Sequence, residues 1–504
     1  MAETKREIER KYEATGETPV PDLTRVRGVS EVLDRGVMEL DAVYYDTPDL
    51  RLAADALTLR RRTGGDDAGW HLKFPVASGI RDEIRAPLAD TLPGELAGLV
   101  RSRVRESEVV PVVRLRSARD VRQLVDADGT LLAELSVDTV HAERLPGGAV
   151  ATWTEIEVEL ADDTDPAFLD AVEKRLRKAG IGPAASASKL ARALAETGGG
   201  PRTKAAPGKP GTAGAAVLAY VREQVEAIVA YDPGVRRDLP DAVHQMRVAC
   251  RRLRSAFKTY RRVLDRERTD PLGEELKWLA AELGVARDQE VLDERLRARV
   301  KALPRTLVLG PVRARLRFRA VALGADARQQ ALTALDSARH LALLEALDAL
   351  LADPPLGKAA GRDARKVLAR AVRHDHDRLA GRIGHALALD PGHERDLALH
   401  EARKAAKRAR YAADAARPTL GKPAKRLAKR VKAVQSLLGE HQDAVVARAA
   451  LRELAVQAHG AGESAFTWGL LYGREEAAAE AAERELPEVW ARASAPGLKA
   501  ALSR

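Results

Sequence analysis

The sequence is poor in cysteine, in aromatic residues and in long apolar runs. Cys250 is the one cysteine among 504 residues, so no disulfide can form within the chain, and a reducing compartment is expected. Charged residues occur from Glu3 onward without an apolar segment, which predicts no signal peptide. No stretch reaches the roughly 18 apolar residues of a membrane-spanning helix. These absences predict a cytoplasmic protein with no membrane partner.

The composition is that of a globular protein with excess positive charge. Hydrophobic residues make up 45% of the chain and charged residues 31%, which is typical of folded proteins. The chain carries 84 Lys and Arg against 74 Asp and Glu, a net charge of +10, so a polyanionic partner is expected. A length of 504 residues predicts two or three domains.

A segment rich in glycine and proline separates two regions of different character. Residues 1–197 are dominated by short β-rich stretches, whereas residues 215–504 show helical periodicity throughout. Residues 198–214 are predicted to be a linker. The chain is therefore predicted to be a multidomain α+β protein.

Charge lies on one face of nearly every predicted strand in the first region. In the first strand, Glu7, Glu9 and Lys11 share a face, because side chains alternate along a strand. Later strands repeat the alternation with the sets Arg60/Arg62, His71/Lys73, Arg81/Glu83/Arg85, Ser136/Asp138 and Glu155/Glu157/Glu159.

An open sheet with one solvated face would also show this alternation. So many strands with few helices favour instead a closed antiparallel β-barrel with flanking helices, whose polar faces line a lumen. Inside it, carboxylates would stand opposite arginines and lysines, and each set alone would repel itself. A divalent cation, Mg²⁺ or Mn²⁺, together with a triphosphate would match both sets.

Seven segments of the first region resemble the CYTH family, the triphosphate tunnel metalloenzymes. In chain order they are EIERK at 7–11, VYYDTPDL at 43–50, LRRR at 59–62, WHLKFP at 70–75, PVVRLRSAR at 111–119, TEIEVEL at 154–160 and SKL at 188–190. They cover nearly the whole region, which is most similar to thiamine triphosphatase and the bacterial inorganic triphosphatases. The resemblance implies a tunnel in which a triphosphate is hydrolysed with a divalent metal.

The resemblance also implies roles by position. The implied metal ligands are Glu7, Glu9, Asp138, Glu155 and Glu157. The implied phosphate-binding cations, with Arg81 added for its place on a polar face, are Lys11, Arg60, Arg62, Lys73, Arg81, Arg119 and Lys189. Tyr44 falls where some members pair a tyrosine with the lysine of E-x-E-x-K for proton transfer. Arg114 and Arg116 have the opposite parity to Arg119 and are second choices.

Lys11 is a candidate for the group that accepts a proton. Crowding by Arg60 and Arg62 would lower its pKa and let it take a proton from the attacking water. The plainer alternative is that Lys11 only neutralises Glu7 and Glu9. The sequence leaves both open.

The second region is predicted to be all-α and to contain a repeat. Short breaks delimit roughly eight to ten helices in antiparallel hairpins. The breaks fall at 232–234, 270–271, 354–355, 390–392 and 418. Corresponding residues of the two copies are His244, Arg247, Leu283, Gly284 and Asp288 with His400, Arg403, Leu438, Gly439 and Asp443. Two duplicated helical bundles are therefore expected.

A basic stripe follows one helix face in each copy. Its members are His244, Arg247, Arg251 and Arg254 in the first copy and His400, Arg403, Lys407 and Arg410 in the second, with Lys429 and Lys432 in a further row. No acidic residue occurs between Val243 and Leu264, although ordinary solvated helices mix charges of both signs. A solvated stripe is the plain alternative, but its duplication favours a basic groove that binds an anion.

This region resembles the CHAD family, a helical partner of CYTH domains. The resemblance rests on the paired His-x-x-Arg helices and covers most of residues 215–500. It implies binding of inorganic polyphosphate without catalysis. Four further histidines lack the spacing of a zinc site and are expected on the surface or in the groove: His374, His376, His385 and His441.

The sequence thus predicts a divalent-metal-dependent triphosphatase joined to a polyphosphate-binding module. A non-catalytic polyphosphate scaffold or sensor, a hydrolase of thiamine triphosphate or nucleotides, and a nucleotidyl cyclase stay open as alternatives. Nucleic acid is a less favoured partner, because the basic helices offer few aromatic rings for stacking. The oligomeric state is not predicted.

Overall fold

In a computed structural model of the chain, the described residues are 3–65, 67–201 and 208–503. The chain divides into two compact units, Met1–Lys204 and Ala205–Arg504. The predicted linker includes residues 202–207, which lie outside the described residues, and its last two positions belong to helix α5 (Ala213–Arg236). Among the described residues, no helix combines the length and apolar character needed to cross a membrane.

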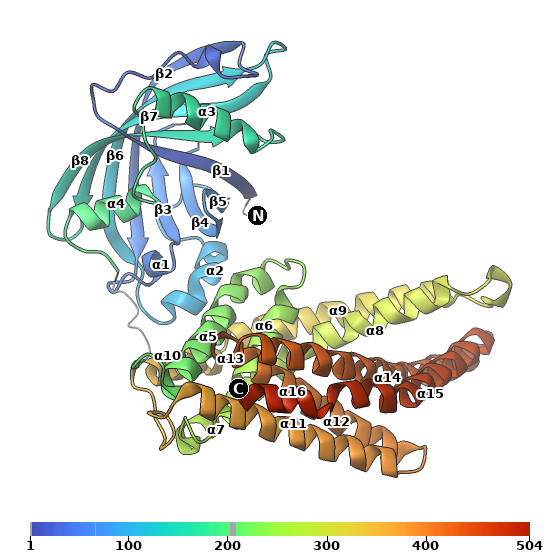
Figure 1. Cartoon of the computed structure of the whole chain (residues 1–504). Helices are drawn as coiled ribbons and strands as arrows, with labels where there is room; N and C mark the ends of the chain where they lie inside the picture. The colour runs from blue at the N-terminus through green and yellow to red at the C-terminus, as the bar shows by residue number, and fades with distance from the viewer. Residues whose placement is uncertain (1–2, 66, 202–207, 504) are drawn as a thin grey trace. The chain divides into compact units, whose positions relative to one another are not determined.

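The first unit is built on antiparallel strands that close into a barrel in the order β1-β5-β4-β3-β2-β6-β7-β8 (Figure 1). The strands are β1 (Glu3–Ala14), β2 (Glu31–Asp46), β3 (Thr58–Thr63), β4 (Gly69–Ala77), β5 (Ile80–Ala86), β6 (Val110–Val125), β7 (Leu131–Arg144) and β8 (Val150–Leu160). Each strand pairs with a neighbour on both sides, so the described barrel has no open edge. The predicted closed barrel is confirmed.

Strand β2 begins at Glu31, well before the segment VYYDTPDL at 43–50 that the sequence singled out. Its first half, from Glu31, pairs with β6 although most of its side chains are exposed or half-buried. Backbone pairing rather than apolar burial therefore holds this half of the strand, which is why the alternation of residues did not reveal it. A register shift between Asp34 and Val37 interrupts the ladder there.

Helices cover the outside of the barrel wall, and the apolar side chains of the strands face them. The helices are α1 (Arg51–Ala54), α2 (Gly94–Val104), α3 (Ala167–Lys178) and α4 (Lys189–Glu196). Trp70 packs in the cluster under α2, Leu135 in the cluster under α3 and Val113 in the cluster under α4. The hydrophobic cores of this unit thus lie outside the barrel, which leaves the inward faces of the strands free to carry charge.

The second unit is all-helical in its described residues, as predicted. Its helices are α5, α6 (Ala242–Thr259), α7 (Arg266–Glu282), α8 (Gly284–Lys301), α9 (Val312–Asp336), α10 (Ala338–Ala352), α11 (Ala364–Ala388), α12 (His393–Ala415), α13 (Arg417–Leu420), α14 (Lys422–Gly460), α15 (Phe466–Ala493) and α16 (Pro496–Ala500). Single 3₁₀ turns occur at Leu23–Arg25, Arg305–Leu307 and Ala501–Ser503.

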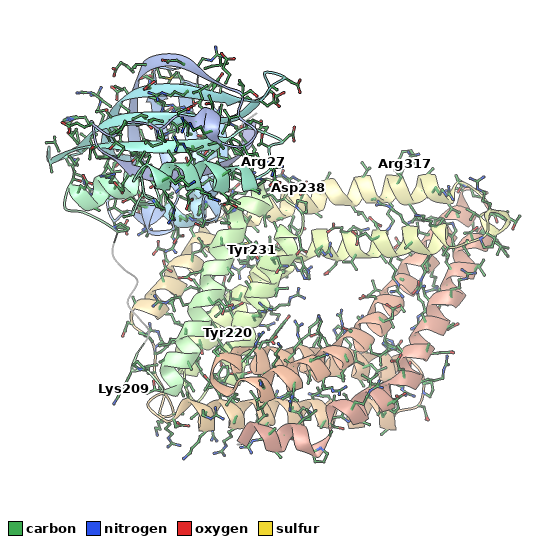
Figure 2. All side chains as sticks on the ribbon, turned by 45° about the horizontal axis from the view of Figure 1, so that its top comes forward. Arg27, Lys209, Tyr220, Tyr231, Asp238 and Arg317 are labelled. Atoms are coloured by element: carbon green, nitrogen blue, oxygen red, sulfur yellow. The ribbon has the colours of Figure 1, made fainter. Side chains whose placement is uncertain are left out.

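The order of the helices agrees with the predicted duplication, because α5 and α6 correspond to α11 and α12. The next helix of the first copy is divided into α7 and α8 at Leu283, whereas its counterpart α14 runs for 39 residues. The α8–α9 and α14–α15 hairpins project from the unit (Figure 1) and share an apolar cluster that includes Leu296 and Leu451. Arg317 projects from α9 into solvent (Figure 2).

Two of the predicted helix breaks are wrong. Pro233 lies inside α5 and Pro271 lies inside α7. A proline removes one backbone hydrogen bond from a helix. Buried neighbours such as Val235 and Thr269 keep these helices packed across the missing bond.

Gly79, in the turn between β4 and β5, is predicted not to tolerate a side chain. Its φ is +71°, and a Cβ there would lie 2.7 Å from the backbone oxygen of Glu9. Gly79→Ala should lower the thermal midpoint of the full chain more than Gly129→Ala, because a Cβ at Gly129, whose φ is +77°, would meet no atom within 4 Å. Since the left-handed conformation costs about 1–2 kcal/mol in both variants, the difference isolates the clash. Equal midpoints in calorimetry would contradict this expectation.

Candidate functional site

A cavity of about 310 Å³ lies inside the barrel and is lined mostly by charged and polar side chains. All the predicted phosphate-binding cations line it, namely Lys11, Arg60, Arg62, Lys73, Arg81, Arg119 and Lys189. Tyr44 and three of the predicted metal ligands, Glu7, Glu9 and Glu157, line the same cavity. Residues from the beginning and from the end of this unit's sequence therefore line the same cavity.

The order of the strands groups the predicted metal ligands apart from most of the predicted phosphate-binding cations. Strands β7, β8 and β1 are consecutive in the barrel and carry Asp138, Glu155, Glu157, Glu7 and Glu9. Strands β5, β4 and β3 are also consecutive and carry Arg81, Lys73, Arg60 and Arg62. The cavity thus has an acidic wall and a basic wall, which become opposed only because the barrel closes.

Asp138, Glu155 and Glu157 form the densest group of carboxylates. One oxygen of each lies within 4.8 Å of the others, and all three side chains are buried. Pairing of β7 with β8 brings them together, because Asp138 is directly opposite Glu155 and Glu157 follows on the same face. Three hard oxygen donors at this separation fit a Mg²⁺ or Mn²⁺ ion.

The ammonium of Lys189 lies among these three carboxylates. Its Nζ is 3.0 Å from Asp138, 2.9 Å from Glu155 and 2.5 Å from Glu157. Arg119 donates hydrogen bonds to both oxygens of Asp138 at 2.7 and 2.8 Å, and to Glu157 at 2.8 Å. Burial raises the pKa of Asp138, but Lys189 and Arg119 outweigh burial and lower it below its ordinary value.

The two carboxylates of β1 lie beside this group rather than within it. Glu7 accepts a hydrogen bond from Lys73 at 2.6 Å, and Glu9 is 3.3 Å from the Nζ of Lys11. Lys11 also pairs with Glu157, so its ammonium connects Glu9 to the group. Three of the five predicted metal ligands therefore converge, Glu9 is adjacent, and Glu7 faces the basic wall.

Lys11 does not have the surroundings predicted for a proton acceptor. It pairs with Glu157 and Glu9 rather than crowding against Arg60 and Arg62. Burial lowers the pKa of Lys11, but the two carboxylates outweigh burial and raise it above its ordinary value. The expected lowering of this pKa is wrong, and the side chain is a persistent ammonium.

Tyr44 lies opposite Arg60 in the ladder between β2 and β3, and its phenol oxygen accepts a hydrogen bond from Arg60 at 3.4 Å. Burial raises the pKa of Tyr44, but Arg60 and nearby lysines lower it below its ordinary value. Among the described residues, no hydrogen bond joins Tyr44 to Lys11, so the predicted pair is not formed in this structure.

Glu83 is a carboxylate of the basic wall that the residue pattern did not single out as a site residue. It is fully buried and lies 2.9 Å from His71, 3.4 Å from Lys73 and 3.6 Å from Arg60. Burial raises its pKa, but these neighbours hold it far below its ordinary value. Glu83 therefore neutralises the basic wall, and its shared parity with Arg81 was the signal that could have found it.

The register of β6 supports Arg119, rather than Arg114 or Arg116, as the arginine that faces the cavity. Residues 114–119 pair with β7 without interruption, so Arg114 and Arg116 face away from the side that carries Arg119. Arg114 donates a hydrogen bond to Asp41 at 2.9 Å, and the side chain of Arg116 is 53% exposed.

In the helical unit, basic side chains of the two copies meet where α6 contacts α12. Arg247 and Arg251 of α6 act electrostatically on Lys407 of α12, as does Arg403. Burial and these cations lower the pKa of Lys407 to about 7. Lys407 itself makes no ion pair with any described residue. We call these four side chains the central basic cluster.

One aspartate from each copy partly offsets the central basic cluster. Arg247 donates two hydrogen bonds to Asp288, at 3.0 and 3.2 Å, and Arg403 lies 3.7 Å from Asp443. These pairs are counterparts in the sequence repeat, so each copy presents the same arrangement. Two carboxylates facing four cations leave positive charge that a polyanion can neutralise.

The other predicted basic residues lie on α6, α12 and α14 without joining this cluster. Their positions are His244 half-buried on α6, Arg254 at 3.5 Å from Glu274, His400 at 2.5 Å from Gln442, Arg410 over the ring of Tyr411 at 4.9 Å, and Lys429 and Lys432 exposed on α14.

Two histidines expected on the surface, His376 and His441, are buried. The Nε2 of His441 lies 3.2 Å from both Asp396 and Glu483. These three side chains also lie close enough together to hold a metal ion, and each of the two carboxylates already has an arginine as its cationic partner.

The barrel with its charged lumen and the duplicated helical unit define the class of the protein. A family model of the CYTH domain matches residues 5–194, and one of the CHAD domain matches residues 219–452. The chain therefore belongs to the proteins that join a CYTH domain to a CHAD domain. The CYTH family includes triphosphatases and cyclases and typically depends on a divalent metal.

The uncharacterized protein Rv2226 of Mycobacterium tuberculosis is 40% identical over 499 residues, which cover 95% of this chain and 94% of that protein. Among solved structures, PptA from Streptomyces chartreusis is 24% identical, with a TM-score of 0.48, and the match covers 55% of this chain and 99% of PptA. The CHAD domain from the plant Ricinus communis is 26% identical, with a TM-score of 0.41, and the match covers 60% of this chain and 97% of that domain.

Glu83→Gln should destabilise the barrel at neutral pH by about 3–5 kcal/mol, because it removes the carboxylate that pairs with Arg60 and one of the two that pair with Lys73. Since the folded-state pKa of Glu83 is depressed, its stabilising effect is present above the ordinary carboxyl pKa of about 4.3 and is lost as the pH falls through the folded-state value. Thermal unfolding of the wild type and the variant between pH 4 and 8 measures the effect, and the difference between their midpoints should persist across this range. Glu13→Gln, at a half-exposed pair with Arg192, is the control and should change the midpoint little.

Proposed function

We propose that the CYTH domain is a divalent-metal-dependent triphosphatase for inorganic triphosphate or the end of a polyphosphate chain, and that the CHAD domain binds inorganic polyphosphate. In this proposal residues 1–197 form the tunnel domain, 198–214 the linker and 215–504 the binding domain. The observation that carries it is the opposition of an acidic and a basic wall across one cavity. A phosphate chain with a bound cation complements both walls.

The basic wall binds the phosphate oxygens. Arg60, Arg62, Lys73 and Arg81 line the cavity from neighbouring strands, and guanidinium groups donate paired hydrogen bonds to phosphate. Their nearest anions in this structure are carboxylates such as Glu83 and Glu7. A phosphate chain thus adds an anion to a wall that already holds its cations in place.

The acidic wall holds the metal. Asp138, Glu155 and Glu157 would bind Mg²⁺ or Mn²⁺, with Glu9 adjacent. When bound, the cation neutralises phosphate oxygens and polarises the phosphorus that is attacked. Arg119 keeps Asp138 and Glu157 oriented toward each other through its hydrogen bonds.

Lys11 and Tyr44 are the groups of this chain assigned to the attacking water, Lys11 as a hydrogen-bond donor and Tyr44 as the group that transfers a proton. Lys11 stays protonated between Glu9 and Glu157 and donates hydrogen bonds to a phosphate oxygen or to the attacking water. The phenol oxygen of Tyr44, whose pKa lies below its ordinary value, can release a proton and receive one from water.

The lining of the cavity favours an inorganic substrate. Among the described residues that line it, Tyr44 is the one aromatic side chain, and it is buried. A nucleotide base or a thiamine ring usually rests on an exposed aromatic or apolar surface. Charged side chains dominate the lining of the cavity, and its apolar members are Met38, Leu40, Leu131, Leu160 and Ala161.

Arg60→Ala should lower kcat/KM for tripolyphosphate about 10–100-fold, because a charge-assisted hydrogen bond is worth about 1.5–3 kcal/mol. Arg114→Ala, which removes an arginine that faces away from the cavity, is the matched control and should retain wild-type turnover. Phosphate release with Mg²⁺, with Mn²⁺ and with a chelator measures both effects, and the chelator should abolish release.

The same assay separates the rival functions. Tripolyphosphate, long-chain polyphosphate, thiamine triphosphate and ATP are supplied in turn to the full chain. A cyclic nucleotide formed from ATP would indicate a cyclase. Binding of triphosphate without phosphate release from any of the four would indicate a sensor and overturn the proposed hydrolysis.

Polyphosphate binding by the CHAD domain is supported by the central basic cluster, which joins equivalent side chains of both copies. The excess of cations over carboxylates gives this site a positive electrostatic potential. Salt screens the solvent-exposed part of that potential strongly. Arg403 and Arg247 are already oriented by aspartates, so they are held in place before an anion arrives.

Polyphosphate binding should weaken as the pH rises above neutrality. The pKa of Lys407 is about 7 in the free protein, and a polyanion favours its charged form, so binding takes up a proton. Affinity should therefore be highest below pH 7 and fall between pH 7 and 9. Burial lowers the pKa values of His244 and His400 below the ordinary value.

Lys407→Arg should remove most of this pH dependence, because an arginine stays charged throughout the range. Lys432→Arg, at an exposed lysine, is the control and should keep it. Fluorescence anisotropy of labelled long-chain polyphosphate, measured with a chelator to prevent hydrolysis, gives the affinities. A wild-type affinity that is constant from pH 6 to 9 would rule out the role given to Lys407.

A further inference from the structure

Lys189 lies where a divalent cation would bind. It is the first residue of α4, and the side chain of Ser188 caps that helix by accepting a hydrogen bond from the backbone of Ala191 at 3.1 Å. Its Nζ contacts Asp138, Glu155 and Glu157 at 2.5–3.0 Å. These are the three carboxylates that converge most closely in the acidic wall.

A lysine and a divalent cation cannot both be held by the same three carboxylates at these distances. The ammonium lies within contact range of all three residues, and two positive ions so close together repel strongly in a buried site. Metal binding therefore requires the ammonium of Lys189 to move away. Its removal also costs energy, because burial is tolerated only while the charge is paired.

The side chain of Lys189 can reach a second position, inside the cavity. Lys189 also lines the cavity, so its flexible stem reaches the space where a phosphate chain would lie. The helix that carries it need not move, because Leu190 and Leu194 anchor α4 against the barrel wall. A phosphate oxygen in the cavity would give the displaced ammonium a new anion.

We infer that Lys189 is a tethered competitor of the divalent cation, which leaves the carboxylates Asp138, Glu155 and Glu157 when a phosphate chain takes up its ammonium. The inference rests on the proposed metal site. It predicts that metal and phosphate bind cooperatively, because each removes an obstacle to the other. By linkage, phosphate raises the affinity for metal by the same factor by which metal raises the affinity for phosphate.

A calorimetric measurement of Mn²⁺ binding to the full chain, in the absence of phosphate, tests the inference. Lys189→Met should bind Mn²⁺ about tenfold more tightly than the wild type, or better, because the ammonium that contacts all three carboxylates is gone. Lys189→Gln, which keeps a polar group in place of the ammonium, should behave in the same way. Arg192→Met is the matched control, since Arg192 lies on the same helix and pairs with Glu13 and Glu196 outside the group of three, and it should not tighten binding.

The second arm adds inorganic phosphate, which chelates Mn²⁺ weakly. Phosphate should tighten Mn²⁺ binding to the wild type and have much less effect on Lys189→Met. Equal Mn²⁺ affinities of the wild type and both Lys189 variants would overturn the inference and leave the proposed metal site intact. Mn²⁺ binding to none of the folded proteins would overturn the metal site and the inference with it. Thermal midpoints with and without Mn²⁺ show which variants are folded.

Discussion

The tunnel depends on the mutual neutralisation of charges that could not be buried alone. A buried carboxylate or ammonium without a partner is costly, and a group of like charges is more so. Asp138, Glu155 and Glu157 are stable together because Lys189 and Arg119 lie among them. On the other wall, Glu83 neutralises the cations around it, Arg60 and Lys73. The barrel can therefore close before any ligand arrives, and a ligand must exchange existing pairs for new ones.

The helical unit treats charge differently. In the tunnel, acids and bases are interleaved closely enough for most charges to be paired inside the wall. In the central basic cluster, two aspartates face four cations, and Lys407 is left without a carboxylate partner among the described residues. A site whose carboxylates and cations are already paired favours a ligand that offers a cation to the carboxylates and an anion to the cations. A site with surplus charge attracts any sufficiently dense anion.

The alternation of residues predicted the charged face of most strands, because a period of two does not depend on tertiary context. Alternation could not show which carboxylates converge, since that depends on register. Register places Asp138 opposite Glu155 and Lys11 opposite Glu157. The environment of Lys11 was therefore predicted wrongly, although its place in the cavity was not.

The helical unit shows the same limit. Repeat spacing predicted the basic stripe, but only tertiary contact between α6 and α12 shows which four of its members meet. Pro233 and Pro271 predicted helix ends because local preference takes no account of buried neighbours that hold a helix across a missing bond.

The hydrophobic cores of the first unit lie beneath α2, α3 and α4, on the outer side of the strands. Small barrels commonly fill their interior with apolar side chains, so that any change of the interior disturbs the packing that holds them together. Here the residues that hold the fold and those that meet the ligand are largely different sets. Evolution or protein design could therefore replace the residues that line the interior, for example to bind sulfated or carboxylated anions, without changing the strands that form the wall. The condition is that acids and bases are replaced in compensating numbers.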